Sequence, residues 1–130
     1  MNKKIITLII GILILSNCKP KSGLEYSFED VQINTSDYYL TLPTGIIKNK
    51  VDSYEEGFYQ HFVYSDHSYV IILRGGSAEL ELPKNEKPGI HSRRQNVDRL
   101  IMVYGNVKTE RKAEFDKAFD IMKEKGLKKK

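Results

Sequence analysis

Apolar and polar residues alternate along most of the chain, and this period of two is typical of half-buried β-strands. In "DYYLTLP" the side chains of Tyr38, Leu40 and Leu42 point to one side of a strand. Pro43 ends the run, because proline cannot donate a hydrogen bond within a sheet. The preceding segment "LEYSFEDVQI" shows a weaker form of the same alternation, so the pattern predicts two strands in this region.

The clearest hairpin signal is "GFYQHFVYSDHSYVIILRGG", in which two aromatic and β-branched runs flank "SDHS". Asp and Ser favour turns because they bond to their own backbone. If Tyr64 pairs with Tyr69, the hairpin has a core side and an outer side, and the outer side is apolar enough that something should partly cover it. The core side then carries Phe58, Phe62, Tyr64, Tyr69, Ile71 and Leu73, and the outer side carries Tyr59, His61, Val63, Val70, Ile72 and Arg74.

Three further segments follow this hairpin. "SAELEL" (77–82) alternates leucine with glutamate and predicts another strand with a wet acidic face. "PKNEKPGIHS" (83–92) has the composition of a loop. "QNVDRLIMVYGNV" (95–107) predicts one long central strand, because residues 100–104 are continuously apolar.

The period changes in "TERKAEFDKAFDIMKEKG", which predicts a helix with Thr109 as its N-cap and Gly126 behind its end. Its apolar residues recur at helical spacing and form one stripe, consisting of Phe115, Ala118, Phe119 and Met122. We therefore predict a single α+β domain over 25–126, with an antiparallel sheet of about five strands and one C-terminal helix packed on it.

The start of the chain has no alternation at all. Lys3 and Lys4 precede the apolar run Ile5–Leu15, which only Thr7 and Gly11 interrupt. A membrane-spanning helix needs about 20 apolar residues, whereas the core of a signal peptide needs roughly 7 to 15 behind a positively charged start. The run has eleven residues, so it predicts a signal peptide.

The segment "LSNC" follows the apolar run and contains the only cysteine of the chain, Cys18. It resembles the lipobox of bacterial lipoproteins, in which a Leu, a small residue and a Gly, Ala or Ser precede a cysteine that becomes acylated. Leu15 and Ser16 match this pattern, and Asn17 stands where Gly, Ala or Ser is usual. The resemblance implies that residues 1–17 are a lipoprotein signal peptide and that Cys18 becomes the acylated first residue.

An acylated Cys18 would attach the protein to a membrane through its acyl chains, and two or more chains hold stably. Residues 18–24 then form the acylated cysteine and a tether. The resemblance implies a location in the bacterial cell envelope, at the outer membrane if the source is Gram-negative, because Lys19 and not an aspartate follows the cysteine. With a single cysteine, the mature chain has no internal disulfide.

Charge adds little to this interpretation. The chain has 21 basic and 17 acidic residues, a net charge of +4, and losing the signal peptide with Lys3 and Lys4 reduces this to +2. The excess lies at the C-terminus, where residues 127–130 form a basic tail. We read the tail as a solvated terminus, with weak contact to anionic lipid as the alternative. Nucleic-acid binding needs a basic face or stripe, so we expect no nucleic-acid partner.

No pattern of residues indicates catalysis. His61, His67 and His91 are scattered, with no helical i, i+4 pair that would point to a metal. The chain has no G-x-S-x-G turn to present a serine, and Gly75-Gly76 matches no phosphate-binding fingerprint. The sequence therefore predicts a non-catalytic protein with no metal and no cofactor.

Tyrosine is in mild excess, with eight in the chain. Tyrosine is enriched at interfaces because it buries area while keeping a hydrogen-bonding group, although the strand preference of tyrosine accounts for the excess equally well. Tyr59 and His61, on the outer side of the hairpin, are the candidate binding residues for a protein partner in the envelope.

The alternative is a small periplasmic ligand-binding protein or hydrolase that uses the loop 83–95. This hypothesis requires that Arg93 and Arg94 converge with His91 on a cavity, where the arginines would bind an anion.

The segments "YYLTLPTGI" and "YEEGFYQHFVYSDHSYVIIL" resemble small sheet-and-helix domains of the Mog1/PsbP type, in which a strand that ends in Pro and Gly leads into a meander. This resemblance implies an α+β fold and assigns no site residues.

Overall fold

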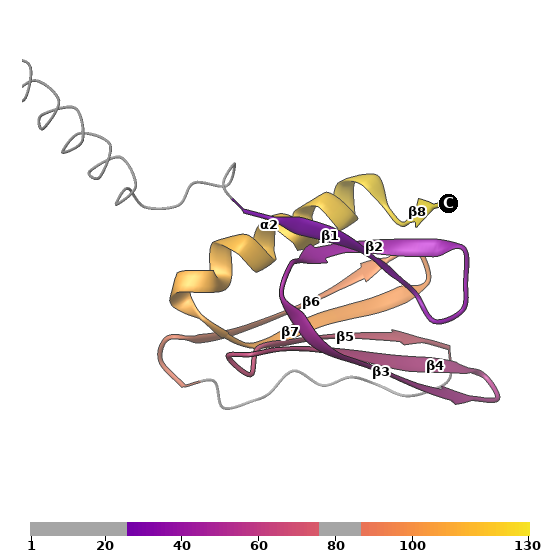
Figure 1. Cartoon of the computed structure of the whole chain (residues 1–130), viewed down its shortest axis with the longest axis horizontal. Helices are drawn as coiled ribbons and strands as arrows, with labels where there is room; N and C mark the ends of the chain where they lie inside the picture. The colour runs from indigo at the N-terminus through magenta and orange to yellow at the C-terminus, as the bar shows by residue number, and fades with distance from the viewer. Residues whose placement is uncertain (1–25, 76–86) are drawn as a thin grey trace, which may run out of the picture.

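The computed structural model describes residues 26–75 and 87–130, and these residues form an α+β fold (Figure 1). Two antiparallel sheets and one C-terminal helix make up the fold, which confirms the predicted class. The elements are β1 (Phe28–Gln32), β2 (Tyr38–Pro43), β3 (Ile46–Tyr54), β4 (Gly57–Tyr64), β5 (Tyr69–Arg74), β6 (Ile90–Val97), β7 (Leu100–Lys108), α2 (Thr109–Lys125) and β8 (Lys128–Lys129).

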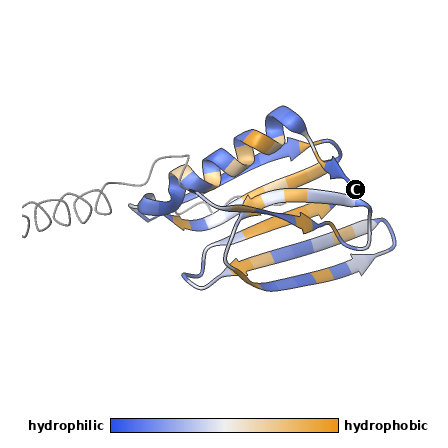
Figure 2. Ribbon diagram, turned by 45° about the horizontal axis from the view of Figure 1, so that its top comes forward, coloured by the Kyte–Doolittle hydropathy of each residue, from blue (hydrophilic) through white to orange (hydrophobic). Residues whose placement is uncertain are grey.

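The large sheet has five strands in the order β3-β4-β5-β7-β6, and the small sheet has three in the order β1-β2-β8. Helix α2 and the small sheet lie together over one face of the large sheet (Figure 1). Much of the helix consists of hydrophilic residues, whereas the central strands are mostly apolar (Figure 2). The fold therefore has two layers with the core between them.

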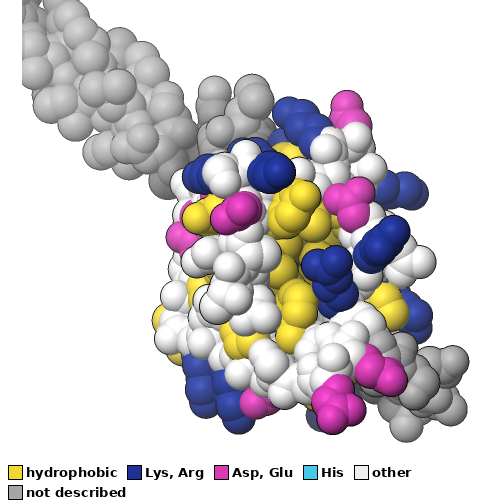
Figure 3. All heavy atoms as spheres, turned by 90° about the vertical axis from the view of Figure 1, so that its right-hand side faces the viewer, with side chains coloured by type: hydrophobic (Ala, Val, Ile, Leu, Met, Phe, Trp, Pro, Cys, Tyr) yellow, Lys and Arg dark blue, Asp and Glu magenta, His cyan; other side chains and the backbone are white. Residues whose placement is uncertain are grey.

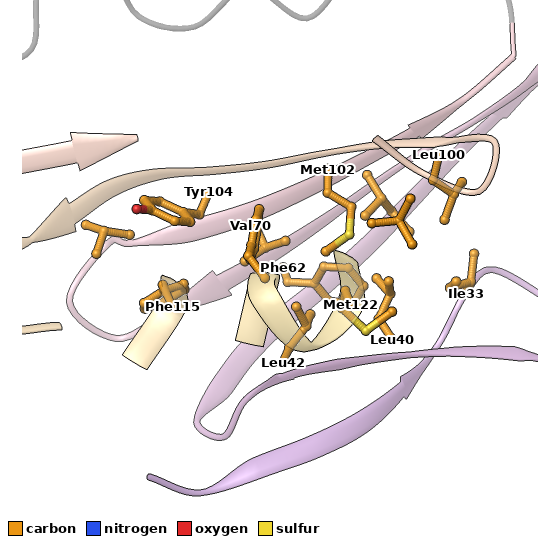
Figure 4. Packing of buried hydrophobic residues seen from close by; sticks show 14 of the residues in the cluster. Ile33, Leu40, Leu42, Phe62, Val70, Leu100, Met102, Tyr104, Phe115 and Met122 are labelled. Carbon is orange, nitrogen blue, oxygen red and sulfur yellow. The ribbon is translucent and has the colours of Figure 1, made fainter. Parts of the chain in front are cut away.

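The core is formed by side chains that these two layers point towards each other. Figure 4 shows Phe62 and Val70 of the large sheet close to Met122 of the helix, in one cluster. Dispersion and hydrophobic burial hold the layers together, because every side chain in this group is closed off from water. The residues with no exposed area are Leu40, Leu42, Phe62, Val70, Ile72, Met102, Phe115 and Phe119, among others.

The helix agrees closely with its prediction. It spans Thr109–Lys125, and the predicted stripe is buried. Its N-cap is Lys108, however, and not Thr109, and no side chain caps that end of the helix. The Thr109 hydroxyl is instead hydrogen-bonded to the imidazole of His91, 2.9 Å away.

The β4–β5 hairpin exists, but its predicted register is wrong by one residue. Val63 pairs with Tyr69, and the Tyr64 backbone N–H donates to Ser68. The loop therefore has three residues and not four, and it closes with His67 in a left-handed conformation at φ 70°. A slip of one residue moves every side chain of β5 to the opposite face. The outer side consequently carries Tyr59, His61, Val63, Tyr69, Ile71 and Leu73, while Val70 and Ile72 lie in the core.

The single long strand predicted over 95–107 is also wrong. It is a hairpin, in which β6 and β7 are joined by a two-residue turn between Val97 and Leu100. Asp98 begins this turn at φ 53°, a conformation that aspartate tolerates better than most residues. As a consequence, much of the predicted loop over 83–95 belongs to a strand, from Ile90 onward.

Two strands were not expected from the sequence. Strand β3 is mostly exposed, so its apolar alternation is faint. Strand β8 forms from the basic tail, where Lys128 and Lys129 pair with Tyr39 and Tyr38 of β2. The predicted strand over 77–82 lies outside the described residues.

Candidate functional site

The predicted residues Tyr59 and His61 lie on the outer face, by which we mean the side of the large sheet turned away from α2 and the small sheet. Their side chains are half-buried. The register places apolar residues around them, so this face is much less polar than an ordinary solvated one. Its members are Tyr59, His61, Val63, Tyr69, Ile71, Leu73, Ile101 and Val103.

Aromatic rings form a row across the outer face. The His61 ring lies between Tyr59 and Tyr69, with its centroid 6.1 Å from the first ring and 5.6 Å from the second. Tyr69 is opposite Gly105, and its ring occupies the space where a side chain at Gly105 would lie. A Cβ at position 105 would displace the tyrosine ring from this position.

A positive rim borders this row. Lys48 and Lys50 of β3 pair with Val63 and His61, so their side chains emerge on the same face. The pKa of His61 is lowered, first by burial and then by the repulsion of these two ammonium groups. Burial also raises the pKa of Tyr59. Both rings are therefore neutral near pH 7 and offer apolar area together with hydrogen-bonding atoms.

Arg93, the third predicted residue, belongs to the interface between β6 and the helix. Its guanidinium donates to Asp120 at 2.8 Å and to Asp116 at 3.2 Å, and it lies over the Phe119 ring at 5.8 Å. These carboxylates satisfy the charge of Arg93 within the fold, so the residue holds the helix on the sheet.

Arg94, the fourth, points the other way. It pairs with Val103 of the outer face, whereas Arg93 pairs with the buried Tyr104. His91 is hydrogen-bonded to Thr109 at the start of the helix. Among the described residues, the three members of the loop hypothesis therefore do not converge, and none of them lines the two pockets at the other end of the sheet that are described below.

No pattern in the sequence indicated the role of Arg111. Its guanidinium bridges the β4–β5 turn and the helix, with Asp66 at 3.1 Å and Glu114 at 2.6 Å. It also lies 5.1 Å from the centre of the Tyr64 ring and 4.9 Å from that of Phe115. Because Asp66 is 45 residues away in the sequence, no local pattern could reveal this contact.

A pocket of about 350 Å³ opens at the end of the molecule where β2, β5, the β6–β7 turn and the C-terminal segment meet. Figure 3 faces this end and shows hydrophobic side chains gathered in a hollow, with basic side chains beside them. We call it the end pocket. It is lined by Tyr38, Arg74, Asp98, Arg99, Leu100 and Leu127.

The two arginines of the end pocket differ from Arg93 and Arg111. Within the described part of the chain, the guanidinium groups of Arg74 and Arg99 have no hydrogen bond and no ion pair. Arg74 also borders a second, more open hollow of about 480 Å³, whose rim includes Glu55 without an ion pair between the two. The sequence did not indicate the end pocket, because its residues come from four separate segments.

Cys18 lies outside the described residues, so the structure gives no geometry for it. Over residues 26–75 and 87–130, no helix combines the length and the apolar character that a membrane span requires. The same residues contain no group of three or more His, Cys, Asp or Glu side chains that could hold a metal ion.

Comparison with known proteins adds no family to the α+β class that the fold defines. No protein-family model, no curated protein and no solved structure matches the chain.

Proposed function

We propose that this chain is a lipid-anchored, non-catalytic binding protein of the bacterial cell envelope. The observation that carries the proposal is the position of Cys18, directly after an eleven-residue apolar run that ends in "LSNC". Cleavage before Cys18 and its acylation would leave the protein on the membrane surface, at the outer membrane if the source is Gram-negative.

The tether length supports this arrangement. Ten residue steps separate Cys18 from Phe28, where β1 begins. An extended chain covers at most about 3.5 Å per residue, so the domain would stay within about 35 Å of its anchor. A domain held this close to a membrane is suited to meeting other components of the envelope.

The outer face is the surface we assign to a protein partner. It combines the rings of Tyr59, His61 and Tyr69 with apolar side chains, which is the composition of an interface core. The ammonium groups of Lys48 and Lys50 would favour a partner with carboxylates at the matching positions.

The anchor is tested by the intact mass of the protein extracted in detergent from its own envelope. We expect a mass that lacks residues 1–17 and includes acyl chains. The variant Cys18→Ala should be released from the membrane or left unprocessed. An unmodified Cys18 in the wild-type protein would contradict the anchor.

The partner is tested by crosslinking in the envelope, followed by identification of proteins recovered in near-stoichiometric amount. Tyr59→Lys should abolish the crosslink, because it places a charge within the row of aromatic rings on the outer face. Ile47→Lys is the matched control, since Ile47 is 68 % exposed on β3 and does not belong to that row. A partner captured equally well by Tyr59→Lys would contradict the assignment of the outer face.

A further inference from the structure

The end pocket holds two arginines whose guanidinium groups have no partner in the part of the chain that the structure describes. Elsewhere in the described residues, Arg93 and Arg111 each contact two carboxylates and at least one aromatic ring. Arg74 and Arg99 have no such partners among residues 26–75 and 87–130, and they line the same hollow. The structure therefore leaves their ten N–H donors, five on each guanidinium, available to a ligand.

The backbone fixes where these two arginines stand. Arg74 is the last residue of β5 and pairs with Leu100 at the start of β7, while Arg99 belongs to the adjoining turn. Both therefore project from one end of the large sheet, across two neighbouring strands. Placement on sheet termini and a short turn orients binding groups better than a long loop does.

Apolar side chains form the rest of the hollow. Leu100 is 3 % exposed, Leu127 is half-buried, and the Tyr38 ring is 40 % exposed. The ammonium of Lys129 lies 6.0 Å from the centre of the Tyr38 ring, which adds a third positive charge at the rim. A ligand that fits this hollow therefore has an anionic group next to an apolar part.

One carboxylate also lines the end pocket, and it already has a structural role. Asp98 accepts a hydrogen bond from the Leu127 backbone N–H at 3.3 Å, which fixes the segment between the helix and β8. The residues that line the end pocket comprise two arginines and one aspartate, so the lining keeps an excess of one positive charge. The excess favours an anion over a neutral or cationic ligand.

We propose that the end pocket binds a phosphate group attached to an apolar moiety. One guanidinium satisfies both oxygens of a carboxylate in a bidentate pair, so a second guanidinium would be redundant for a carboxylate. A phosphate monoester has more terminal oxygens than a carboxylate and can accept from two forks at once. A volume of about 350 Å³ is near the lower end of the range for ligand pockets, which fits a headgroup better than a large molecule.

Two sources supply such a phosphate: the headgroup of a membrane lipid, and a soluble phosphate in the surrounding compartment. Isothermal titration of the full protein in maltoside detergent, which contains no phosphate, separates them. The probes are phenyl phosphate, a soluble phosphate monoester with an apolar ring, and short-chain phosphatidic acid, a lipid whose headgroup is also a phosphate monoester. Binding of the lipid alone assigns the pocket to headgroups, whereas binding of both with similar affinity assigns it to soluble phosphates; either result supports the proposal.

The variants Arg74→Gln and Arg99→Gln should each weaken binding by about tenfold or more, because a charge-assisted hydrogen bond is lost. Arg94→Gln is the matched control, since it removes the same charge from an exposed arginine on the outer face and should leave the affinity unchanged. Thermal unfolding of each variant verifies that it remains folded.

Three results would overturn the proposal. The first is that neither probe binds the wild-type protein. The second is that both pocket variants bind like the wild type. The third is that Arg94→Gln weakens binding as much as they do, which would reduce the effect to overall charge. The titration requires neither acylation nor a protein partner, so its outcome is independent of the tests on Cys18 and the outer face.

Discussion

The two faces of the large sheet are built from the same strands, but they have different surroundings. On the covered face, Phe62, Val70 and Ile72 have no exposed area, because α2 and the small sheet close over them. On the outer face, their neighbours His61 and Ile71 remain half-buried. An antiparallel sheet with one solvated face normally alternates apolar with polar residues. The central strands β4, β5 and β7 of this sheet are largely apolar on both faces, and the core between the two layers requires only one of them.

The largest difference between the two faces should appear when one isoleucine of β5 is shortened to alanine on each face. Ile72→Ala should cost about 3 kcal/mol of unfolding free energy, because it leaves a cavity in a closed core. Ile71→Ala, one position away, should cost about 1 kcal/mol, since the side chain is only half-buried. Urea denaturation of both variants measures the difference, and equal losses would show that the outer face is as closed as the core.

A second contrast is between arginines that contact carboxylates and arginines that have no partner among the described residues. Arg111→Gln should cost about 2 kcal/mol, because Asp66 and Glu114 lose charge-assisted hydrogen bonds at a partly buried site. Arg99→Gln, in an exposed turn, should change stability by less than about 0.5 kcal/mol. Chemical denaturation at low and high salt provides the measurement. A loss for Arg99→Gln as large as that for Arg111→Gln would mean that the end pocket is structural.

Hydroxyl groups allow a finer comparison of the two faces. Tyr64→Phe should cost about 1 kcal/mol, because the Tyr64 hydroxyl donates at 2.7 Å to the buried carbonyl of Pro43. Tyr69→Phe should leave stability nearly unchanged, since its hydroxyl lies on the half-open outer face. Thermal unfolding of the two variants is the measurement, and a larger loss for Tyr69→Phe would reverse the assignment of the faces.

The sequence predicted the elements of the fold better than their pairing. Helix α2 was located from the spacing of Phe115, Ala118, Phe119 and Met122, because helical periodicity depends only on nearby residues. The β4–β5 register depended on whether the turn has three or four residues. The three-residue turn is stabilised by Asp66, whose carboxylate accepts hydrogen bonds from the backbone N–H and the hydroxyl of Ser68. Composition alone did not show this.

The candidate sites were less predictable because their contacts are distant in sequence. Tyr59 and His61 were placed correctly on one face, since alternation within β4 is local. Arg93 and Arg94 were expected to act together, but neighbouring residues of a strand point to opposite faces, and the predicted loop there is strand β6. The end pocket joins Arg74 and Leu127 from opposite ends of the domain, and no spacing within the sequence indicates such a pair.

The smallest effect expected is a pH dependence that belongs to the outer face alone. His61 has a lowered pKa because it is partly buried and because Lys48 and Lys50 repel its charged form; its other neighbours, Tyr59 and Tyr69, are neutral. The unfolded chain therefore takes up this proton more readily than the folded protein does. The stabilising effect of a neutral His61 is fully present above about pH 6.5 and is lost as the pH falls through the folded pKa.

Urea denaturation at about pH 7.5 and about pH 5 should show a loss of stability on acidification that is smaller in His61→Gln than in the wild type, because glutamine does not titrate. The difference between the two proteins isolates His61 from the carboxylates, which both proteins share. Identical pH profiles for the two proteins would mean that His61 is open to water, and the outer face would then lack the partial burial that distinguishes it from an ordinary solvated surface.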